Sequence, residues 1–487
     1  MKIRNLFASA LVLTFALSVA GCGGGGGSTA RAVKSFSKGV ITAKGSVTVN
    51  GVKYDSSTSK VRFENLSGAN ADNSKLKVGM VVELKGTVND DGYSGSAVNI
   101  EFTDNLQGKI DSVDTVAKTL TVFGQTVKVD DQTNFYGGTS GLTGPTPLRA
   151  GDVVEVSGFP DSAGVIRATF IEKKNGLTEF EIKGTVSNYT QGGTTFTLTP
   201  PNSSQPLTVT LGAGVQPPPG FDNKVYVEVR TSGSGLAFIA TKVELEQELS
   251  ADEKDKVELE GLVTSVDTVK KTFVLNGVTI DASAMTMPTV GQRVEVEGLL
   301  LNGVLVPVKQ VQVEQESDTK VEADVEAISG NSVTLLGMTG IVTPTTEFKD
   351  DQNDNSAHGI TFGLANLKPG DHVEVETAKN PSDPKTVLII RLVRKDPSTQ
   401  IVVQKYVDTI PTSVPGTFML GNVIIDINAT PANNIKDLNN NPTTIDAFIK
   451  ALRVGKTLVR AVGVGTNFTS ATKTLKADEA DIQAQLT

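Results

Sequence analysis

Apolar and polar residues alternate along most of the chain, in short runs that turn residues separate. In the segment 293–297, two valines alternate with one arginine and two glutamates. A period of two places successive side chains on opposite faces of a β-strand. Valine, threonine and phenylalanine dominate these runs, and dipeptides such as Asn50-Gly51 and Asn276-Gly277 suit the tight turns of hairpins. The pattern predicts an all-β protein of short strands.

The same order of strands and turns recurs along the chain, which indicates internal repeats. Residues 108–114 and 261–267 share the pattern Gly-x-(Ile/Val)-x-Ser-Val-Asp, and a Val-Glu-Val strand follows each of them, at 154–156 and 294–296. Four further copies, the last of them diverged, are found near Gly39, at Gly184, near Val325 and around Gly416. We therefore expect about six repeats of one β-unit.

Each unit is too small to cover both faces of a flat sheet, so closure into a small barrel is the expected solution. The sequence predicts a tandem array of about six small, partly open barrels of the OB type. The alternative is that the six units pair into three larger sandwiches. Apolar positions at helical spacing predict short helices in the last two units, at 443–452 with a threonine cap and at 362–367.

The repeat pattern divides the chain into consecutive segments. The expected boundaries are 1–21 for a signal peptide, 22–34 for a glycine-rich tether, and 35–104, 105–175, 176–250, 251–317, 318–397 and 398–487 for the six β-repeats. The last repeat is the most diverged of the six.

The segment before the repeats has the order of a bacterial export signal. A basic start precedes an apolar run at 6–20, which is shorter than the about 20 residues that a membrane-spanning helix needs. Two positions after the run comes Cys22, the only cysteine of the chain, and the residues Val19-Ala20-Gly21-Cys22 resemble the lipobox of bacterial lipoproteins. This resemblance implies cleavage before Cys22 and its acylation, for example with palmitate. An ordinary secretory signal or a short membrane anchor with a chance cysteine is the alternative.

The residues after Cys22 add to this interpretation. A glycine run at 23–27 behaves as a flexible coil, and more than one acyl chain gives stable anchoring. The residue after Cys22 is Gly23 and not an aspartate. In Gram-negative lipoproteins this resemblance implies passage to the outer membrane. We therefore expect a cell-envelope protein, lipid-anchored on the periplasmic or surface face of that membrane.

The repeats also resemble a known domain family. Their strand and turn pattern, Gly-x-Val-x-x-Val-Asp, Thr-x-Thr-Val, Val-x-Val-Asp, Leu-x-x-Gly-Asp-x-Val-Glu-Val-x-Gly and Ala-x-x-Ile-Glu, resembles the DUF5666 domain of bacterial lipoproteins. The copies at 108–172 and 261–313 match best, and the third and sixth copies match least. The matching residues are turns and strand faces, so the resemblance implies a fold and carries over no catalytic residue.

Composition and charge narrow the classes of partner. The net charge is −9 and the basic residues are scattered, whereas binding to phosphates needs clustered Lys and Arg, so we expect no nucleic-acid partner. A single cysteine leaves no disulfide. A transmembrane barrel would also show alternating strands, but aromatic residues make up only 5% of the chain, too few for two girdles.

Few residues suggest chemistry. Catalysis by His358 or His372, the only histidines, would need a partnered base or nucleophile. We expect His358 in a polar loop and His372 at a surface strand position. With Cys22 acylated, thiol chemistry and cysteine zinc sites are not expected. The sequence therefore predicts no enzyme and no cofactor.

Three sets of residues are candidates for binding. Asp351, Asn353 and Asn355 have the one-three-five spacing of a calcium loop, although Ser356 and Phe362 replace its usual glycine and glutamate; a solvated hairpin loop is the alternative. The other candidates are Met285 and Met287 for Cu(I), and Phe135, Tyr136 and Phe221 as platforms for sugars. Packing in a core is the alternative for both.

The resulting hypothesis is a non-catalytic, lipid-anchored cell-envelope protein. Its barrels would form an extended, semi-flexible rod that acts as a binding or spacer scaffold, because repeating a unit multiplies binding faces or length. The membrane, through the N-terminal acyl groups, and a protein or polysaccharide of the envelope are the expected partners. The alternative is a lipoprotein that binds a ligand or a calcium-type metal ion.

Overall fold

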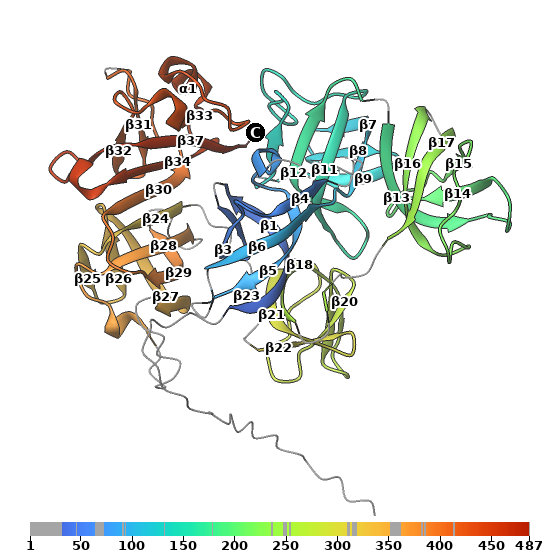
Figure 1. Cartoon of the computed structure of the whole chain (residues 1–487), viewed down its shortest axis with the longest axis horizontal. Helices are drawn as coiled ribbons and strands as arrows, with labels where there is room; N and C mark the ends of the chain where they lie inside the picture. Colours follow the sequence, from blue (N-terminus) through green and yellow to red (C-terminus); the bar gives the residue numbers. More distant parts are fainter. Residues whose placement is uncertain are drawn as a thin grey trace, which may run out of the picture. The chain divides into compact units, whose positions relative to one another are not determined.

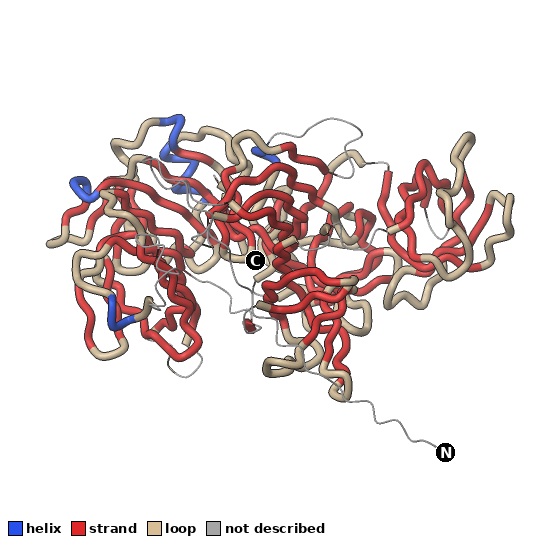
Figure 2. Tube along the Cα trace, turned by 60° about the horizontal axis from the view of Figure 1, so that its bottom comes forward, coloured by secondary structure: helices blue, strands red, loops and turns tan. Residues whose placement is uncertain are grey.

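The computed structural model describes the repeats but not the N-terminal segment. The described residues are 32–486 without 45, 64–72, 90–91, 93, 131, 178, 235–236, 247–250, 253–254, 309–311, 314–318, 351–361, 381–382, 384–385 and 413. Strands make up most of this part of the chain, and its helical segments are few and short (Figure 2). None of the described helices is long and apolar enough to cross a membrane.

The first repeat is a closed, five-stranded barrel. Its strands are β1 (Val33–Ala43), β2 (Val47–Val49), β3 (Val52–Asp55), β5 (Val81–Val88) and β6 (Ser94–Phe102). They pair in the order β1-β2-β3-β6-β5 and back to β1. The strands β3 and β6 run parallel, and the remaining four pairs of the ring are antiparallel. This is the closed Greek-key arrangement of an OB-type barrel.

The second, third and fourth repeats follow the same closed order of pairing, whereas the fifth and sixth contribute to one 10-stranded sheet and part of the sixth forms a separate 4-stranded sheet. The principal strands of the second repeat are β7 (Leu106–Asp114), β8 (Thr119–Val122), β9 (Gln125–Lys128), β11 (Val153–Pro160) and β12 (Ile166–Lys174), and those of the third are β13 (Glu179–Ser187), β14 (Thr195–Thr199), β15 (Leu207–Leu211), β16 (Tyr226–Ser234) and β17 (Ala237–Leu245). The fourth repeat has β18 (Lys256–Asp267), β19 (Thr272–Leu275), β20 (Val278–Asp281), β21 (Arg293–Leu301) and β22 (Val304–Pro307). The fifth has β24 (Thr319–Asp324), β25 (Ala327–Ser329), β26 (Ser332–Leu335), β27 (Met338–Asp350), β28 (His372–Lys379) and β29 (Val387–Arg394), and the sixth has β30 (Gln400–Tyr406), β31 (Thr417–Leu420), β32 (Val423–Asp426), β34 (Thr457–Val464), β36 (Thr474–Lys476) and β37 (Glu479–Gln485). Shorter strands are β4 (Lys60–Phe63), β10 (Asn134–Tyr136), β23 (Gln312–Val313), β33 (Ile435–Lys436) and β35 (Phe468–Thr469).

The predicted fold class is confirmed: the chain is an all-β tandem array of small OB-like barrels. In the first four repeats the ring of strand pairs closes within one repeat, so these repeats are barrels in their own right and not paired half-units of a sandwich. The predicted turns form as expected. Asn276 and Gly277 have φ of 50° and 78° between β19 and β20, and a two-residue hairpin turn with both φ values positive matches the twist of its strands.

The expected helices in the last two repeats are present but shorter than predicted. In the sixth repeat, α1 (Ile445–Ala451) begins after Thr444, whose side chain accepts a hydrogen bond from the Ala447 amide, as an N-cap does. In the fifth, a single 3-10 turn, η3 (Leu364–Asn366), occupies the predicted place. The first repeat has a similar turn, η1 (Asn73–Lys75), that the sequence pattern did not predict.

The barrels are joined in pairs by continuous sheets. The first and fourth repeats share a 12-stranded sheet through β1 and β18, which pair in parallel; the second and third share an 11-stranded sheet; the fifth and sixth share a 10-stranded sheet through β24 and β30. The blue β1 and the yellow β18 lie side by side in Figure 1. A partner in space is therefore not always the neighbour in sequence.

Shared sheets also lead to shared cores. Phe36, in β1 of the first repeat, is fully buried among Val257, Leu259 and Phe273 of the fourth repeat. The hydrophobic residues of the second and third repeats likewise form one cluster, and those of the fifth and sixth form another. The stability of one repeat therefore depends on side chains from another.

The replacement Phe36→Ala tests this dependence. Removing a fully buried phenylalanine should cost about 3 to 5 kcal/mol, and the loss should appear in the fourth repeat, because the ring packs in that core. Hydrogen exchange of the amides in β19 and β20 measures it. Phe273→Ala, in the fourth repeat itself, is the matched control; faster exchange confined to the first repeat would contradict the shared core.

Candidate functional site

Charged residues on the outer faces of the barrel strands are buried. In the Val-Glu-Val strands, the valines point into the barrel and the glutamate points away from it. In these and in the other barrel strands, several glutamates that alternate with core residues are each 8% exposed or less: Glu155, Glu181, Glu228, Glu258, Glu260, Glu322 and Glu374. A buried carboxylate needs a charged or hydrogen-bonding partner, and two of these glutamates, Glu258 and Glu260, have one in another repeat.

The contact between the first and fourth repeats shows this clearly. Glu258 accepts a hydrogen bond from the Ser37 hydroxyl at 3.2 Å, and Glu260 accepts one from the backbone amide of Val40 at 2.9 Å. Glu260 also pairs with Arg293 of its own repeat, with 2.6 Å between Nε and Oε1. These bonds reinforce the parallel pairing of β1 with β18.

The fifth repeat carries the densest charge network. Lys320 and Lys395 both pair with Glu374, at 2.7 and 3.3 Å. Burial alone would raise the pKa of Glu374, but these two lysines lower it to about 2. Arg391 pairs with Glu347 at 2.8 Å and with Glu376 of β28 at 3.2 Å. The Glu374 carboxylate therefore stays ionised although it is buried.

His372 belongs to the same network, and its expected surface position is wrong. It is 3% exposed, its Nδ1 lies 2.8 Å from Asp324 Oδ1, and its Nε2 lies 3.3 Å from Glu322 Oε1. The hydrogen bond with Glu322 raises the pKa of His372. A position facing away from its own barrel was expected to face water, but the neighbouring charged groups cover it.

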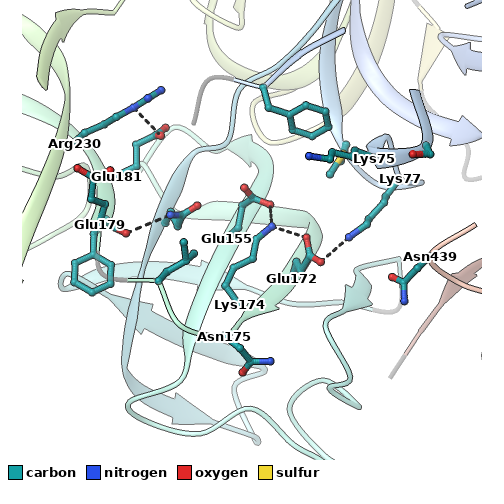
Figure 3. A pocket seen from close by; sticks show the side chains of 16 residues that line it. Lys75, Lys77, Glu155, Glu172, Lys174, Asn175, Glu179, Glu181, Arg230 and Asn439 are labelled. Atoms are coloured by element: carbon teal, nitrogen blue, oxygen red, sulfur yellow. Dashed lines mark hydrogen bonds and ion pairs between the residues drawn. The ribbon is translucent and has the colours of Figure 1, made fainter. Parts of the chain in front are cut away.

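The described residues form a cavity of about 550 Å³ (Figure 3). The first three repeats supply nearly all of its wall, and the sixth supplies Asn439. It is lined by Phe63, Ser74, Lys75, Lys77, Met80, Gln107, Glu155, Glu172, Lys174, Asn175, Leu177, Glu179, Phe180, Glu181, Arg230 and Asn439. Its volume lies in the range of small-molecule sites.

One wall of the cavity is a chain of alternating charges. Glu155 lies 2.8 Å from Lys174, which lies 2.7 Å from Glu172, which in turn lies 2.6 Å from Lys77 (Figure 3). Burial would raise the pKa of Glu172, but Lys174 and Lys77 lower it below its usual value. Since Lys77 belongs to the first repeat and the others to the second, this chain links the two repeats beside the cavity.

A cluster of carboxylates also lies beside the cavity. Arg230 lies 3.8 Å from Glu181, and Asp104 lies in the segment between β6 and β7 at 4% exposure. Burial, followed by the nearby Glu181 and Glu155, raises the pKa of Asp104 well above its usual value. The cavity thus presents both signs of charge beside the apolar side chains of Phe63 and Met80, a lining suited to a small ligand with polar and apolar parts.

Several residues singled out in the sequence lie outside the described residues. These are the lipid-attachment candidate Cys22, the calcium candidates Asp351, Asn353 and Asn355, and His358. Within the described ranges, no group of three or more His, Cys, Asp or Glu side chains could hold a metal ion. Met285 and Met287 pack against the core of the fourth repeat.

The aromatic candidates for a sugar platform are core residues instead. Tyr136 is fully buried, and its hydroxyl donates to the carbonyl oxygens of Val78 at 3.0 Å and Gln483 at 3.1 Å. Phe135 is also buried, and Phe221 packs edge-on against neighbouring rings. Tyr136 therefore joins the first, second and sixth repeats.

The sequence did not predict the buried charge network or the cavity. Alternation identifies which residues face away from a barrel, but it carries no information about what covers them. The one available signal was the recurring glutamate between two valines, at 155, 228, 295 and 374. This signal does not distinguish a face that meets water, which is common for an antiparallel sheet, from a face that another barrel covers.

The replacement Lys174→Met tests the charge chain. Removing one partner of a buried pair leaves the carboxylates uncompensated and costs about 3 to 5 kcal/mol; since Lys174 is 26% exposed, we expect the lower end of this range. Urea denaturation measures the loss. Lys242→Met breaks an exposed pair of similar length and should cost at most about 1 kcal/mol; equal losses would contradict a buried role for Lys174.

The raised pKa of Asp104 predicts a pH dependence of stability. In the unfolded chain an aspartate titrates near about 3.9, so the neutral carboxyl favours folding below that pH, and this contribution is lost as the pH rises through the raised value. Asp104→Asn is neutral throughout. The stability of the wild type minus that of the variant, measured by denaturation from pH 4 to pH 8, should therefore fall; a rise would show that Asp104 is stabilised as an anion.

Comparison with known sequences and structures identifies the repeats. The sequence model of the domain of unknown function DUF5666 matches four segments, 38–101, 107–172, 260–307 and 322–385. No curated protein matches the chain. A solved structure described as drosophila Unr CSD456 aligns with 14% identity over 45% of this chain and 98% of its own, with a TM-score of 0.14. The four matched segments correspond to the first, second, fourth and fifth barrels, so these four repeats are DUF5666 domains arranged in tandem.

Proposed function

We propose that this protein is a non-catalytic, lipid-anchored scaffold of the bacterial cell envelope, and that its barrels bind a partner rather than act as a spacer. The anchor is Cys22, through the lipobox that it completes, with the glycine run as tether. Passage to the outer membrane follows from Gly23 by the same resemblance. The proposal has two parts, anchoring and binding, which rest on different observations.

The pairing of the first and fourth repeats carries the binding part. A spacer gains its function from length, which requires each repeat to contact only its neighbours in sequence. Here Ser37 and Glu258, 221 residues apart, share a hydrogen bond, and β1 and β18 share a sheet. A chain that folds back in this way gives up length and gains composite surfaces such as the cavity between the first three repeats.

The outer face of the second and third strands supports a hydroxyl-rich partner. In OB-type barrels this face commonly binds oligosaccharides or oligonucleotides. In three repeats it carries facing threonine pairs: Thr121 with Thr126, Thr197 with Thr208, and Thr334 with Thr339. Uncharged hydroxyls can donate to and accept from sugar hydroxyls, so an envelope polysaccharide is favoured as partner.

The alternative, a lipoprotein that binds calcium at Asp351, Asn353 and Asn355, stays a prediction, because those residues lie outside the described ranges. The ion pairs of the fifth repeat neither support nor oppose it, since their carboxylates already have lysine and arginine partners.

The replacement Cys22→Ala tests the anchoring. Without the thiol no acyl chain can be attached, so the protein should move from the detergent-rich to the aqueous phase in detergent phase separation and lose labelling by a palmitate analogue. Gly26→Ala, in the same segment, should leave both unchanged. A Cys22→Ala protein that remains labelled and detergent-bound would disprove the lipid anchor, but it would not contradict the proposal that the barrels bind a partner.

A further inference from the structure

The hairpin of β21 and β22 in the fourth repeat exposes aliphatic side chains. Leu299 and Leu301 are each 38% exposed and Val308 is 57% exposed. Leu299 pairs across the hairpin with Val306, and Leu301 pairs with Val304. We call these five residues, Leu299, Leu301, Val304, Val306 and Val308, the apolar hairpin face.

The apolar hairpin face is separate from the core of its barrel. Leu300 and Leu305, which alternate with its residues along the two strands, are 8% and 0% exposed and belong to the core of the fourth repeat. Because successive side chains of a strand point to opposite sides, the face points outward. Its side chains therefore cannot be explained by packing within the fourth barrel.

The second repeat shows what an apolar residue at this position does when it is covered. Its fourth strand reads Val-Glu-Val-Ser-Gly-Phe, and that of the fourth repeat reads Val-Glu-Val-Glu-Gly-Leu, so Phe159 corresponds to Leu299. Phe159 is 2% exposed and packs against Val40, Val81 and Leu262. The first repeat, by contrast, has Thr87 at the corresponding position. An apolar residue at this strand position therefore indicates a face that is covered by another surface.

The apolar hairpin face lies beside the point where the chain from Cys22 enters the sheet. Lys256 of β18 pairs with Ser35 of β1 on one side and with Leu299 of β21 on the other. Neighbouring strands are about 4.8 Å apart, so β1 and β21 run about 10 Å apart. Val33, two residues before Ser35 and therefore on the same face of the sheet, is 45% exposed.

Chain length places a tethered membrane within reach of this face. Val33 follows Cys22 by 11 positions, which span at most about 40 Å when fully extended and about 20 Å on average for a glycine-rich coil. An acyl group at Cys22 thus holds a bilayer surface close to Val33. Tethering at such distances raises the effective concentration of the second contact.

We infer that the apolar hairpin face is a second membrane contact, which inserts its leucines and valines at the boundary of headgroups and acyl chains. This inference rests on the lipid anchor of the proposed function. The occupant is a bilayer surface, because an anchored membrane is the partner whose position the chain itself constrains. Two contacts, one covalent and one apolar, fix which side of the fourth repeat faces the membrane, whereas a tether alone leaves the barrels free to rotate.

Vesicle binding of the non-acylated chain tests the contact separately from the anchor. The chain from Gly23 onward contains every described element, and it is mixed with vesicles of phosphatidylethanolamine and phosphatidylglycerol. The double variant Leu299→Ser and Leu301→Ser should lower its partition coefficient roughly tenfold, given the loss of several buried CH₂ groups. Ile239→Ser, at a 53% exposed position of the third repeat, is the matched control and should leave binding unchanged.

A second measurement uses the intact lipoprotein. A polarity-sensitive fluorophore on Val304→Cys should shift to shorter wavelengths when the acylated protein is reconstituted in the same vesicles, and lipid-borne quenchers should reach it. An unchanged emission, or equal vesicle binding by the leucine double variant, would overturn the membrane contact. Dimers in light scattering that the double variant abolishes would instead assign the face to a second copy. Failure of acylation at Cys22 would affect only the intact lipoprotein, so it is distinguishable from failure of the contact.

Discussion

The structure depends on the burial of charged strand faces between barrels. A small barrel fills its interior with alternate residues of each strand, and the remaining residues, which include glutamates such as Glu155 and Glu258, point outward. When two barrels meet, these carboxylates leave water, and each must find a lysine, an arginine or an amide. Buried ion pairs add little net stability compared with apolar packing, but an incorrect partner leaves an uncompensated charge, which is costly. The network therefore selects which faces can meet.

This constraint accounts for the way the repeats associate. Three pairs of barrels share sheets, and in the pair formed by the first and fourth repeats the hydrogen bonds from Ser37 and Val40 to glutamates reinforce the register of the parallel strands. The same pairing carries Phe36 into the core of the other barrel. Apolar burial supplies the driving force, and the charges restrict it to one arrangement. The repeats are consequently coupled, although each of the first four closes its own ring.

The two candidate functional surfaces, the cavity and the apolar hairpin face, lie where an outward barrel face is not covered by another barrel. The cavity beside Lys77 and Lys174 remains open because three barrels meet there without filling the space between them. The apolar hairpin face is exposed, although its counterpart Phe159 is covered. The cavity is built from several repeats, and the apolar hairpin face is defined by its position beside the N-terminal strand. Neither surface depends on a single sequence motif. A protein built in this way can acquire binding surfaces by varying outward residues while each barrel keeps its fold.

The sequence by itself determined the local structure. The alternation around Val294 predicted strands, Asn276-Gly277 predicted a hairpin turn, and Thr444 predicted a helix cap, because strand, turn and cap preferences act over a few residues. The resemblance to a domain family indicated that the same fold is repeated along the chain. Only the tertiary structure decided that His372 is buried, that Tyr136 joins three repeats and that Phe36 stabilises a distant barrel. These outcomes depend on which outward faces meet, and a periodic pattern records that a residue faces away from its own core but not what will cover it.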